Sequence, residues 1–202
     1  MGNQTPREVL TKFYSDNNLG ANGGLASPYV KIELNSWFHF YFPNFDARRK
    51  AVLKHDVHHI LTEYKTDLSE ESEISAWEIA SGCKSYWAAF LIDTSGLMMG
   101  IPLNLWGTVK AFSRGRKTKN LYDNRFSEEL MLDTKITELR KQLNLDKYPK
   151  NTQPSVIDFI LFFLFTIFGI MHSIISLAIL PFIILYSIYI ELMMRNSKQR
   201  NE

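Results

Sequence analysis

The pattern of hydrophobic and polar positions divides the chain into a mixed N-terminal part and an apolar C-terminal part. In the first part, apolar residues recur at intervals of three and four, the period of an α-helix with one buried face. This periodicity predicts helices over residues 46–64, 69–84, 86–99, 103–112 and 128–143. No segment alternates as a half-buried strand does, so the expected fold class is all-α.

Capping residues predict where three of these helices begin. Asp46, Ser69 and Ser127 each precede a periodic segment, and each side chain can accept a hydrogen bond from the first helical turn. Residues 96–102 contain two glycines and a proline and predict a break between two helices. The aromatic block at residues 37–42 is expected in the core or on a lipid-facing surface.

The C-terminal apolar run is long enough to meet lipid. The 32 residues from Phe159 to Ile190 contain no Asp, Glu, Lys or Arg. As one helix they would extend about 48 Å, against about 30 Å for the hydrocarbon core of a bilayer. This length favours a hairpin that bends near Gly169–Ser173. The alternatives are one long tilted helix, with its remainder at the interface or bent at Pro181, and a helix pair in a soluble core.

The domain organisation follows from this division. We expect a helical domain over residues 1–147, a linker over 148–158, a membrane anchor over 159–190 and a polar basic tail over 191–202. A hairpin would hold the basic residues of both flanks on one side, which places the helical domain on the cytoplasmic, positive side of the membrane. His172, inside the apolar run, is expected to be neutral and bonded to a carbonyl at the bend.

Composition narrows the classes of partner. The chain has 23 Lys and Arg against 21 Asp and Glu, a formal charge of +2, which is too balanced to favour a nucleic-acid partner. Its single cysteine, Cys83, excludes a disulfide within the chain and a cysteine-rich metal site.

A histidine cluster is the strongest chemical feature. His55 and His59 are four residues apart and therefore share one face of the predicted helix 46–64, where both can bind one metal ion. Glu71 follows after eleven residues, enough for a second helix to return its first turn beside them. Imidazole and carboxylate ligands suit zinc or iron, with positions open for water or substrate. Asp56 is expected as a fourth ligand or as a support for an imidazole.

Other interpretations of these histidines remain open. A polar helix face with histidines in solvent has the same spacing. The HxxHH pattern of residues 55–59 also occurs in membrane desaturases, but those enzymes need more histidines than the five present here. Phosphohydrolases of the HD type need a further histidine and a distant aspartate, roles that His39 and Asp93 would have to fill.

The chain resembles the ubiquinone (coenzyme Q) biosynthesis Coq-four family, whose signature is HDxxH, eleven residues and Glu. Residues 55–59 and Glu71 match this signature without a gap. Residues 61–66 and 73–78 are similar to the family's segments around the signature, and residues 114–122 to a basic segment of bacterial members. The resemblance therefore covers roughly residues 45–145.

Two positions depart from the family pattern. Glu63 and Glu70 stand where the family has glycine, and they bring extra carboxylates close to the expected ligand Glu71. Glu70 or Glu73 therefore remain alternatives as the carboxylate ligand.

The resemblance implies an enzyme that acts on a polyprenylated ubiquinone precursor, an aromatic ring acid dissolved in the membrane. The ring carboxylate would be replaced by hydroxyl through oxidative decarboxylation. The implied cofactor is one divalent metal ion, zinc or iron, and the implied partners are membrane lipids and other ubiquinone-pathway proteins, with a homodimer as a further expectation. The catalytic metal-binding group would consist of His55, Asp56, His59 and Glu71.

A basic segment is expected to bind the substrate carboxylate or anionic lipid headgroups, with a solvated loop as the alternative. Its residues are Arg114, Arg116, Lys117 and Lys119.

Two other functions remain open at this level. One is a noncatalytic scaffold that binds prenylated lipid and pathway enzymes, with the metal bracing two helices. The other is a metal-dependent hydrolase with a metal-bound water as its nucleophile. A shell closed by four protein ligands favours the scaffold, and an open position favours catalysis.

Overall fold

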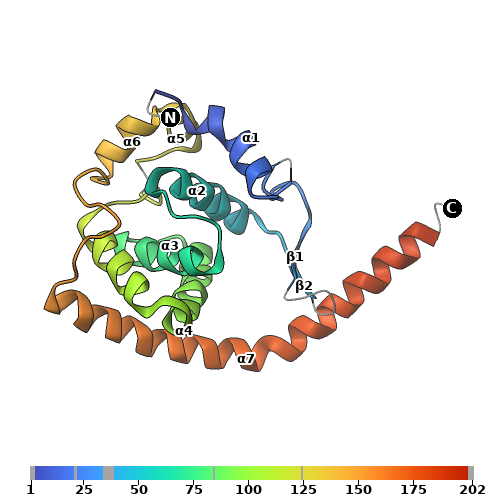
Figure 1. The fold of residues 1–202 in the computed structure, drawn as a ribbon. Helices are drawn as coiled ribbons and strands as arrows, with labels where there is room; N and C mark the ends of the chain where they lie inside the picture. Colours follow the sequence, from blue (N-terminus) through green and yellow to red (C-terminus); the bar gives the residue numbers. More distant parts are fainter. Residues whose placement is uncertain (1–2, 21, 34–38, 84, 124, 200–202) are drawn as a thin grey trace.

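The computed structural model shows a helical body that rests on one long C-terminal helix (Figure 1). The structure describes residues 3–20, 22–33, 39–83, 85–123 and 125–199. Helices dominate these residues, so the all-α prediction is confirmed. The elements are α1 (Pro6–Asp16), β1 (Tyr29–Glu33), β2 (His39–Pro43), α2 (Asp46–Thr62), α3 (Leu68–Ser81), α4 (Trp87–Lys117), α5 (Glu128–Asp133), α6 (Ile136–Gln142) and α7 (Val156–Gln199).

The packed pair α3 and α4 forms the centre of the body, and small residues allow the two backbones to approach closely. A Cβ atom on Gly96 would lie 2.2 Å from the Ser75 hydroxyl, and one on Gly100 would lie 2.8 Å from the Ser72 hydroxyl. Neither position of α4 therefore has room for a larger side chain.

The break predicted over residues 96–102 is displaced, because α4 continues through this segment and its non-helical residue is Asn104. The helix deviates at Asn104, two residues after Pro102, with φ −156° and ψ 70°. Asn104 stabilises the kink with its side chain, which accepts a hydrogen bond from Gly107 N at 3.1 Å and donates one to Glu73 at 2.9 Å. Proline removes a helical hydrogen bond, and here the helix kinks without ending.

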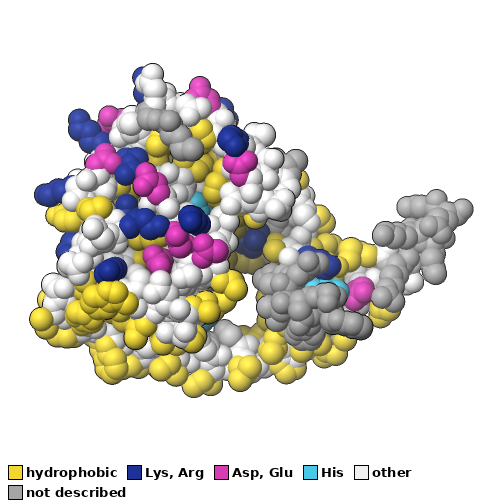
Figure 2. Space-filling view, in the orientation of Figure 1, with side chains coloured by type: hydrophobic (Ala, Val, Ile, Leu, Met, Phe, Trp, Pro, Cys, Tyr) yellow, Lys and Arg dark blue, Asp and Glu magenta, His cyan; other side chains and the backbone are white. Residues whose placement is uncertain are grey.

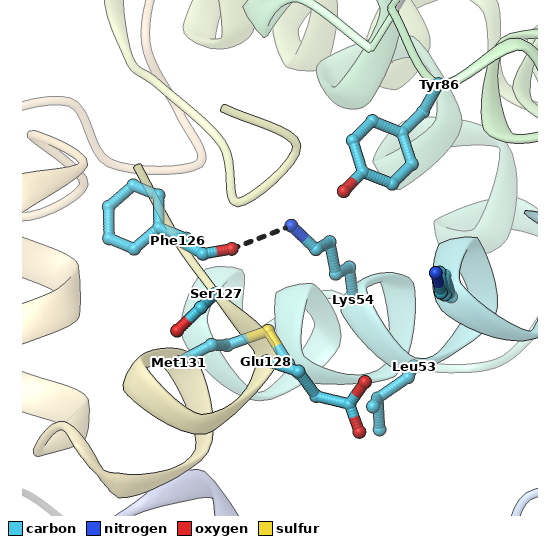
Figure 3. A pocket seen from close by; sticks show the side chains of 8 residues that line it. Leu53, Lys54, Tyr86, Phe126, Ser127, Glu128 and Met131 are labelled. Carbon is cyan, nitrogen blue, oxygen red and sulfur yellow. Dashed lines mark hydrogen bonds between the residues drawn. The ribbon is translucent and has the colours of Figure 1, made fainter. Parts of the chain in front are cut away.

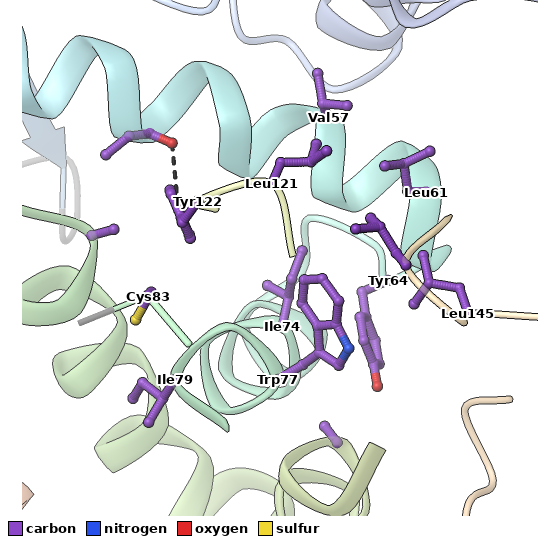
Figure 4. Packing of buried hydrophobic residues seen from close by; sticks show 14 of the residues in the cluster. Val57, Leu61, Tyr64, Ile74, Trp77, Ile79, Cys83, Leu121, Tyr122 and Leu145 are labelled. Atoms are coloured by element: carbon purple, nitrogen blue, oxygen red, sulfur yellow. Dashed lines mark hydrogen bonds between the residues drawn. The ribbon is translucent and has the colours of Figure 1, made fainter. Parts of the chain in front are cut away.

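The core lies between α2, α3 and the segment after α4. Figure 4 shows Trp77 of α3 between Ile74 and Tyr64, with Leu61 of α2 and Leu145 close by. The Trp77 indole is fully buried and donates its N–H to the Thr118 hydroxyl at 2.9 Å. This contact satisfies the polar atom of the largest core side chain and fixes the end of α4 against α3.

We expect Gly115→Ala to lower the free energy of unfolding by about 2 kcal/mol, the usual cost of overpacking. The added Cβ would lie 2.4 Å from the Trp77 carbonyl oxygen, a backbone atom that cannot rotate away. Chemical denaturation of the purified protein measures the change. Ser95→Ala, at an exposed helical position of α4, is the control and should unfold like the wild type; equal stability of both variants would contradict the close packing.

The helix starts differ slightly from those predicted. α3 is capped by Asp67 instead of Ser69, because the Asp67 carboxylate accepts hydrogen bonds from both Ser69 N and Glu70 N at 3.1 Å. Asp46 is the first residue of α2, after Phe45 at the N-cap. Ser127 is confirmed as the cap of α5.

The helix predicted over residues 128–143 is divided into α5 and α6. Thr134 and Lys135 between them have ψ near 140°, which is extended backbone. Both helices lie beside α1 at the top of the view in Figure 1.

Two short strands were not predicted. β1 and β2 pair antiparallel, with Val30 opposite Phe42 and Lys31 opposite Tyr41. β2 is the second half of the aromatic block, and aromatic side chains favour paired, half-buried strands even without strict alternation. Trp37 and Phe38 of this block lie outside the described residues.

The hairpin interpretation of the apolar run is wrong, because α7 is one continuous helix from Val156 to Gln199. Gly169 does not form a bend but allows α7 to pack closely on α4. A Cβ atom on Gly169 would lie 2.4 Å from the Met98 sulfur of α4. Ser173 donates its hydroxyl to the Gly169 carbonyl within the helix at 2.9 Å. His172, expected to bond a carbonyl at the bend, has no hydrogen-bond partner for its buried Nδ1 within the described residues.

The linker predicted over residues 148–158 overlaps the start of α7. Asp158 accepts hydrogen bonds from the backbone N–H and the hydroxyl of Ser155, at 2.7 and 2.8 Å, which caps the helix. The same carboxylate accepts one from Ser113 of α4 at 2.8 Å. The apolar helix is therefore fastened to the body at its first turn.

Candidate metal centre

The site lies between the C-terminal half of α2 and the first turn of α3. His55 Nε2 and His59 Nε2 are 3.0 Å apart, and each lies 3.3 Å from one oxygen of Glu71. The predicted return of Glu71 to the histidines is therefore present in the fold. Ligand atoms of all three residues lie within 4.8 Å of one another, close enough to bind one metal ion.

The other ring nitrogen of each histidine is held by a fixed acceptor. His59 Nδ1 lies 2.9 Å from the Tyr64 carbonyl oxygen, which has only lone pairs to offer, so Nδ1 carries the hydrogen. His55 Nδ1 lies 3.1 Å from Glu78 and donates to this carboxylate in the same way. Each Nε2 is therefore oriented toward Glu71. A hydrogen bond from the other ring nitrogen is the usual support of metal-binding histidines.

Charge in this site is balanced by a proton on His55. Burial lowers the pKa of His55, but Glu78 and Glu71 outweigh it and raise that pKa well above its usual value. Burial raises the pKa of Glu71, but the interactions with His55 and His59 outweigh it and bring the value to about 2. The space between the two Nε2 atoms and Glu71 thus already favours a positive charge, which a divalent cation would replace.

Glu78 is the fully buried centre of the supporting network. Its Oε1 accepts hydrogen bonds from His55 Nδ1 and, at 2.5 Å, from His58 Nδ1, and its Oε2 accepts one from the Tyr122 hydroxyl at 3.1 Å. His58 in turn accepts a hydrogen bond at Nε2 from Leu121 N at 2.8 Å. His58 is therefore buried and structural, and not a solvated residue at the edge of the site.

Glu78 was not predicted as part of the site. Its sequence signal is the spacing from Glu71, seven residues or two helical turns, which places both carboxylates on one face of α3. A second signal is its position within the apolar segment 76–79, where a charged residue requires buried partners.

Asp56 does not join the converging group. Its carboxylate is buried beside Tyr14 and Gly23, and burial raises its pKa to about 6. Oδ2 has no hydrogen-bond partner within the described residues. As the structure stands, the ion would have three protein ligands, and Asp56 lies next to them.

The alternative carboxylate ligands bind elsewhere. Glu70 pairs with Lys150 and accepts a hydrogen bond from Lys65 N at 2.9 Å. Glu73 accepts the hydrogen bond from Asn104 at the kink of α4. Of the three neighbouring glutamates, Glu71 alone converges with the histidines.

Of the two further residues that the HD-type interpretation needs, His39 lies away from the site and Asp93 lies close to it. His39 lies on β2, where Nε2 is 3.8 Å from Glu191 of α7. Asp93 of α4 is buried near Glu78 and His55, in a second group whose ligand atoms lie within 4.8 Å of one another. Burial and the adjacent Glu78 raise the pKa of Asp93 well above its usual range. Asp93 therefore lies behind the site as a buried carboxyl group next to Glu78 and His55.

The family models, characterised proteins and solved structures compared with this chain yielded no match.

The four basic residues predicted to bind substrate do not form one open surface. Arg114 is buried, and its guanidinium donates to the Tyr148 and Thr62 carbonyls at 2.8 and 3.1 Å. Arg114 therefore has a packing role instead of the predicted binding role. Arg116 and Lys117 face Asp158 of α7, at 3.0 and 3.9 Å. Their charges fasten α4 to α7. Lys119 is exposed and lines a shallow pocket with Asp123.

A separate pocket of about 320 Å³ lies on another face of α2 (Figure 3). Lys54 points into it and donates hydrogen bonds to the Leu121 and Phe126 carbonyls at 2.6 and 3.1 Å. Its ammonium also lies 4.9 Å from the centre of the Tyr86 ring. None of the residues that line this pocket belongs to the His55 group, so the pocket is not the entrance to the metal centre.

Proposed function

We propose that this protein is a metal-dependent enzyme that acts on a polyprenylated aromatic ring acid at a membrane. The observation that carries the proposal is the convergence of His55 Nε2, His59 Nε2 and Glu71, with each Nδ1 held by its own acceptor. The ring acid is inferred from the resemblance of residues 55–71 to the Coq-four signature. Two helices long and apolar enough to cross a membrane support the location.

Three protein ligands favour catalysis over a scaffold. A four-coordinate ion bound by His55, His59 and Glu71 would keep one position for water or substrate, as catalytic sites do and structural sites do not. The site is also reachable from one side, since the Glu71 side chain is 36% exposed while that of His59 is 2% exposed. A substrate carboxylate would therefore approach along Glu71.

The proposed reaction breaks the bond between the ring and its carboxylate, releases carbon dioxide and places a hydroxyl on the same ring carbon. This is a two-electron oxidation, so dioxygen and an external reductant would have to be supplied. When bound, the ion would supply Lewis acidity toward the carboxylate, and iron would add redox chemistry that zinc lacks. The chain itself supplies orientation, through Glu78 and the Tyr64 carbonyl, and a partly dry site.

The test follows a prenylated hydroxybenzoic acid, labelled at the carboxyl carbon, with iron-loaded or zinc-loaded protein in detergent, dioxygen and a reductant. Labelled carbon dioxide and the ring-hydroxylated product should appear together with wild-type protein. Glu71→Ala should lower the rate by more than about 100-fold, because it removes a ligand and not only its support.

Glu70→Ala is the matched control, since this neighbouring glutamate pairs with Lys150 and should leave turnover unchanged. Metal-loaded wild-type protein that binds the acid but releases no carbon dioxide would contradict the enzymatic proposal and favour the scaffold. Hydrolysis of a phosphate ester or amide that is lost in Glu71→Ala would favour the hydrolase instead.

A further inference from the structure

The two faces of the helix α7 differ in polarity between residues 159 and 190. Its polar residues between 159 and 190, tyrosines aside, and its one glycine there fall within about 120° of the circumference. They are Thr166, Gly169, His172, Ser173, Ser176 and Ser187. The buried positions of α7, Asp158, Phe162, Gly169, Ser187 and Ile190, lie on the same side. The polar face of α7 is therefore the face that contacts the body, at residues 158–169 and again at 187–190.

The opposite face is apolar and open. It carries many exposed large hydrophobic side chains and, between 159 and 190, no charge. They include Phe163, Leu164, Ile167, Ile170, Met171, Ile174, Ile175, Leu177, Phe182, Leu185 and Ile188. Figure 2 shows hydrophobic side chains gathered along this lower edge of the molecule. Such an extended apolar surface requires an apolar environment.

The flank of α4 adjoins this surface. Trp106 of α4 stacks on Phe159, with ring centres 5.9 Å apart, and Phe90 lies against Phe168. The large exposed hydrophobic side chains of α4 are Trp87, Leu91, Ile92, Met99, Leu103, Leu105 and Trp106. The apolar surface thus belongs to two helices, and α4 is at the same time packed on α3 and contains the buried Asp93.

The body contacts α7 near both ends. Phe162 packs on Phe112 of α4, with ring centres 5.6 Å apart. At the other end, Tyr41 of β2 donates its backbone N–H to the Ser187 hydroxyl at 2.9 Å. From Phe162 to Ser187 the helix rises about 38 Å, more than the about 30 Å of a hydrocarbon core.

A transmembrane α7 would therefore put α4 and β2 on opposite sides of the bilayer. The chain between β2 and α2 has only residues 44 and 45, so the two strands themselves would have to cross. β1 and β2 form a sheet of two strands with open edges, and each unpaired backbone group in lipid costs several kcal/mol. The contacts at both ends of α7 are thus incompatible with a span.

We infer that α7 lies along the plane of the membrane, with its outer face and the flank of α4 in the lipid and the body on one side only. The occupant of the apolar surface is a lipid bilayer, because no Asp, Glu, Lys or Arg interrupts residues 159–190. The in-plane placement of α7 does not depend on the metal or on the reaction. It is therefore tested independently of the proposed function.

The experiment asks whether both ends of α7 are on the same side of the membrane. In a Cys83→Ala background, Asn151→Cys and Asn196→Cys place one exposed thiol before α7 and one near its end. The full-length protein is reconstituted in phosphatidylcholine vesicles and treated with a membrane-impermeant maleimide, and intact mass gives the number of labels on each molecule.

An in-plane helix yields molecules with two labels or none, whatever the orientation in the vesicles. A spanning helix yields molecules with one label and overturns the inference, and so does protein that fails to float with the vesicles. Lys12→Cys with Asn151→Cys is the matched control, because both positions lie on the body and must give two labels or none. Detergent should convert all molecules to two labels.

Discussion

Purified protein in which both His55 and His59 are changed to alanine should contain no stoichiometric metal. The change removes two of the three converging ligands and leaves Glu71 as the only ligand of the group. A single carboxylate binds zinc or iron far more weakly than two imidazoles and a carboxylate at one point. Elemental analysis of detergent-purified wild-type and variant protein measures the difference.

His39→Ala is the matched control for this variant. His39 is a partly buried histidine on β2 whose neighbour is Glu191, so its loss should leave the metal content unchanged. Membrane binding should also persist in the double variant, because the apolar surface of α7 lies apart from α2. Stoichiometric metal retained by the double variant would rule out this site as the metal centre.

The identity of the metal also separates the proposed reactions. Iron that is lost in the double variant supports oxidative decarboxylation. Zinc that is lost in the same way confirms the site but favours hydrolysis or a scaffold, since zinc has no redox chemistry.

The ligand spacing was predictable because it depends on local geometry. Four residues bring His55 above His59 on any α-helix, and the segment between Thr62 and Leu68 is long enough for one turn. The hydrogen-bond acceptors that support the two histidines were harder to predict from the sequence. The Tyr64 carbonyl faces His59 only because Glu63 ends α2 in the left-handed conformation, with φ 67°. Glycine is the residue that usually adopts this conformation, so a glutamate there gave no local signal for the turn.

The apolar C-terminal run could not be predicted as well as the ligand spacing, because its structure depends on distant contacts. The length of residues 159–190 favoured a hairpin only for a helix that crosses the bilayer. The function of Gly169 depends on Met98, which is 71 residues away in the sequence, and no local pattern reports such a contact. The strands β1 and β2 were missed for the same reason, since their stability comes from each other and from Ser187 of α7.

Glu78→Ala should lower the free energy of unfolding by about 3–5 kcal/mol, the usual cost of breaking a buried charged network. The alanine would leave His58 Nδ1 without an acceptor in a fully buried space, and the Tyr122 hydroxyl would keep only the Ala51 carbonyl, at 3.3 Å. Chemical denaturation in detergent measures the loss.

Tyr122→Phe is the matched control, because it removes one hydrogen bond of the same network and should cost only about 1 kcal/mol. Glu78→Gln keeps the shape and one acceptor, so the protein should still fold, but His55 loses its charged support. Its metal affinity should fall about 10- to 100-fold, as for other residues that orient metal-binding histidines. A Glu78→Gln protein with wild-type metal affinity would show that Glu78 stabilises the core without positioning His55.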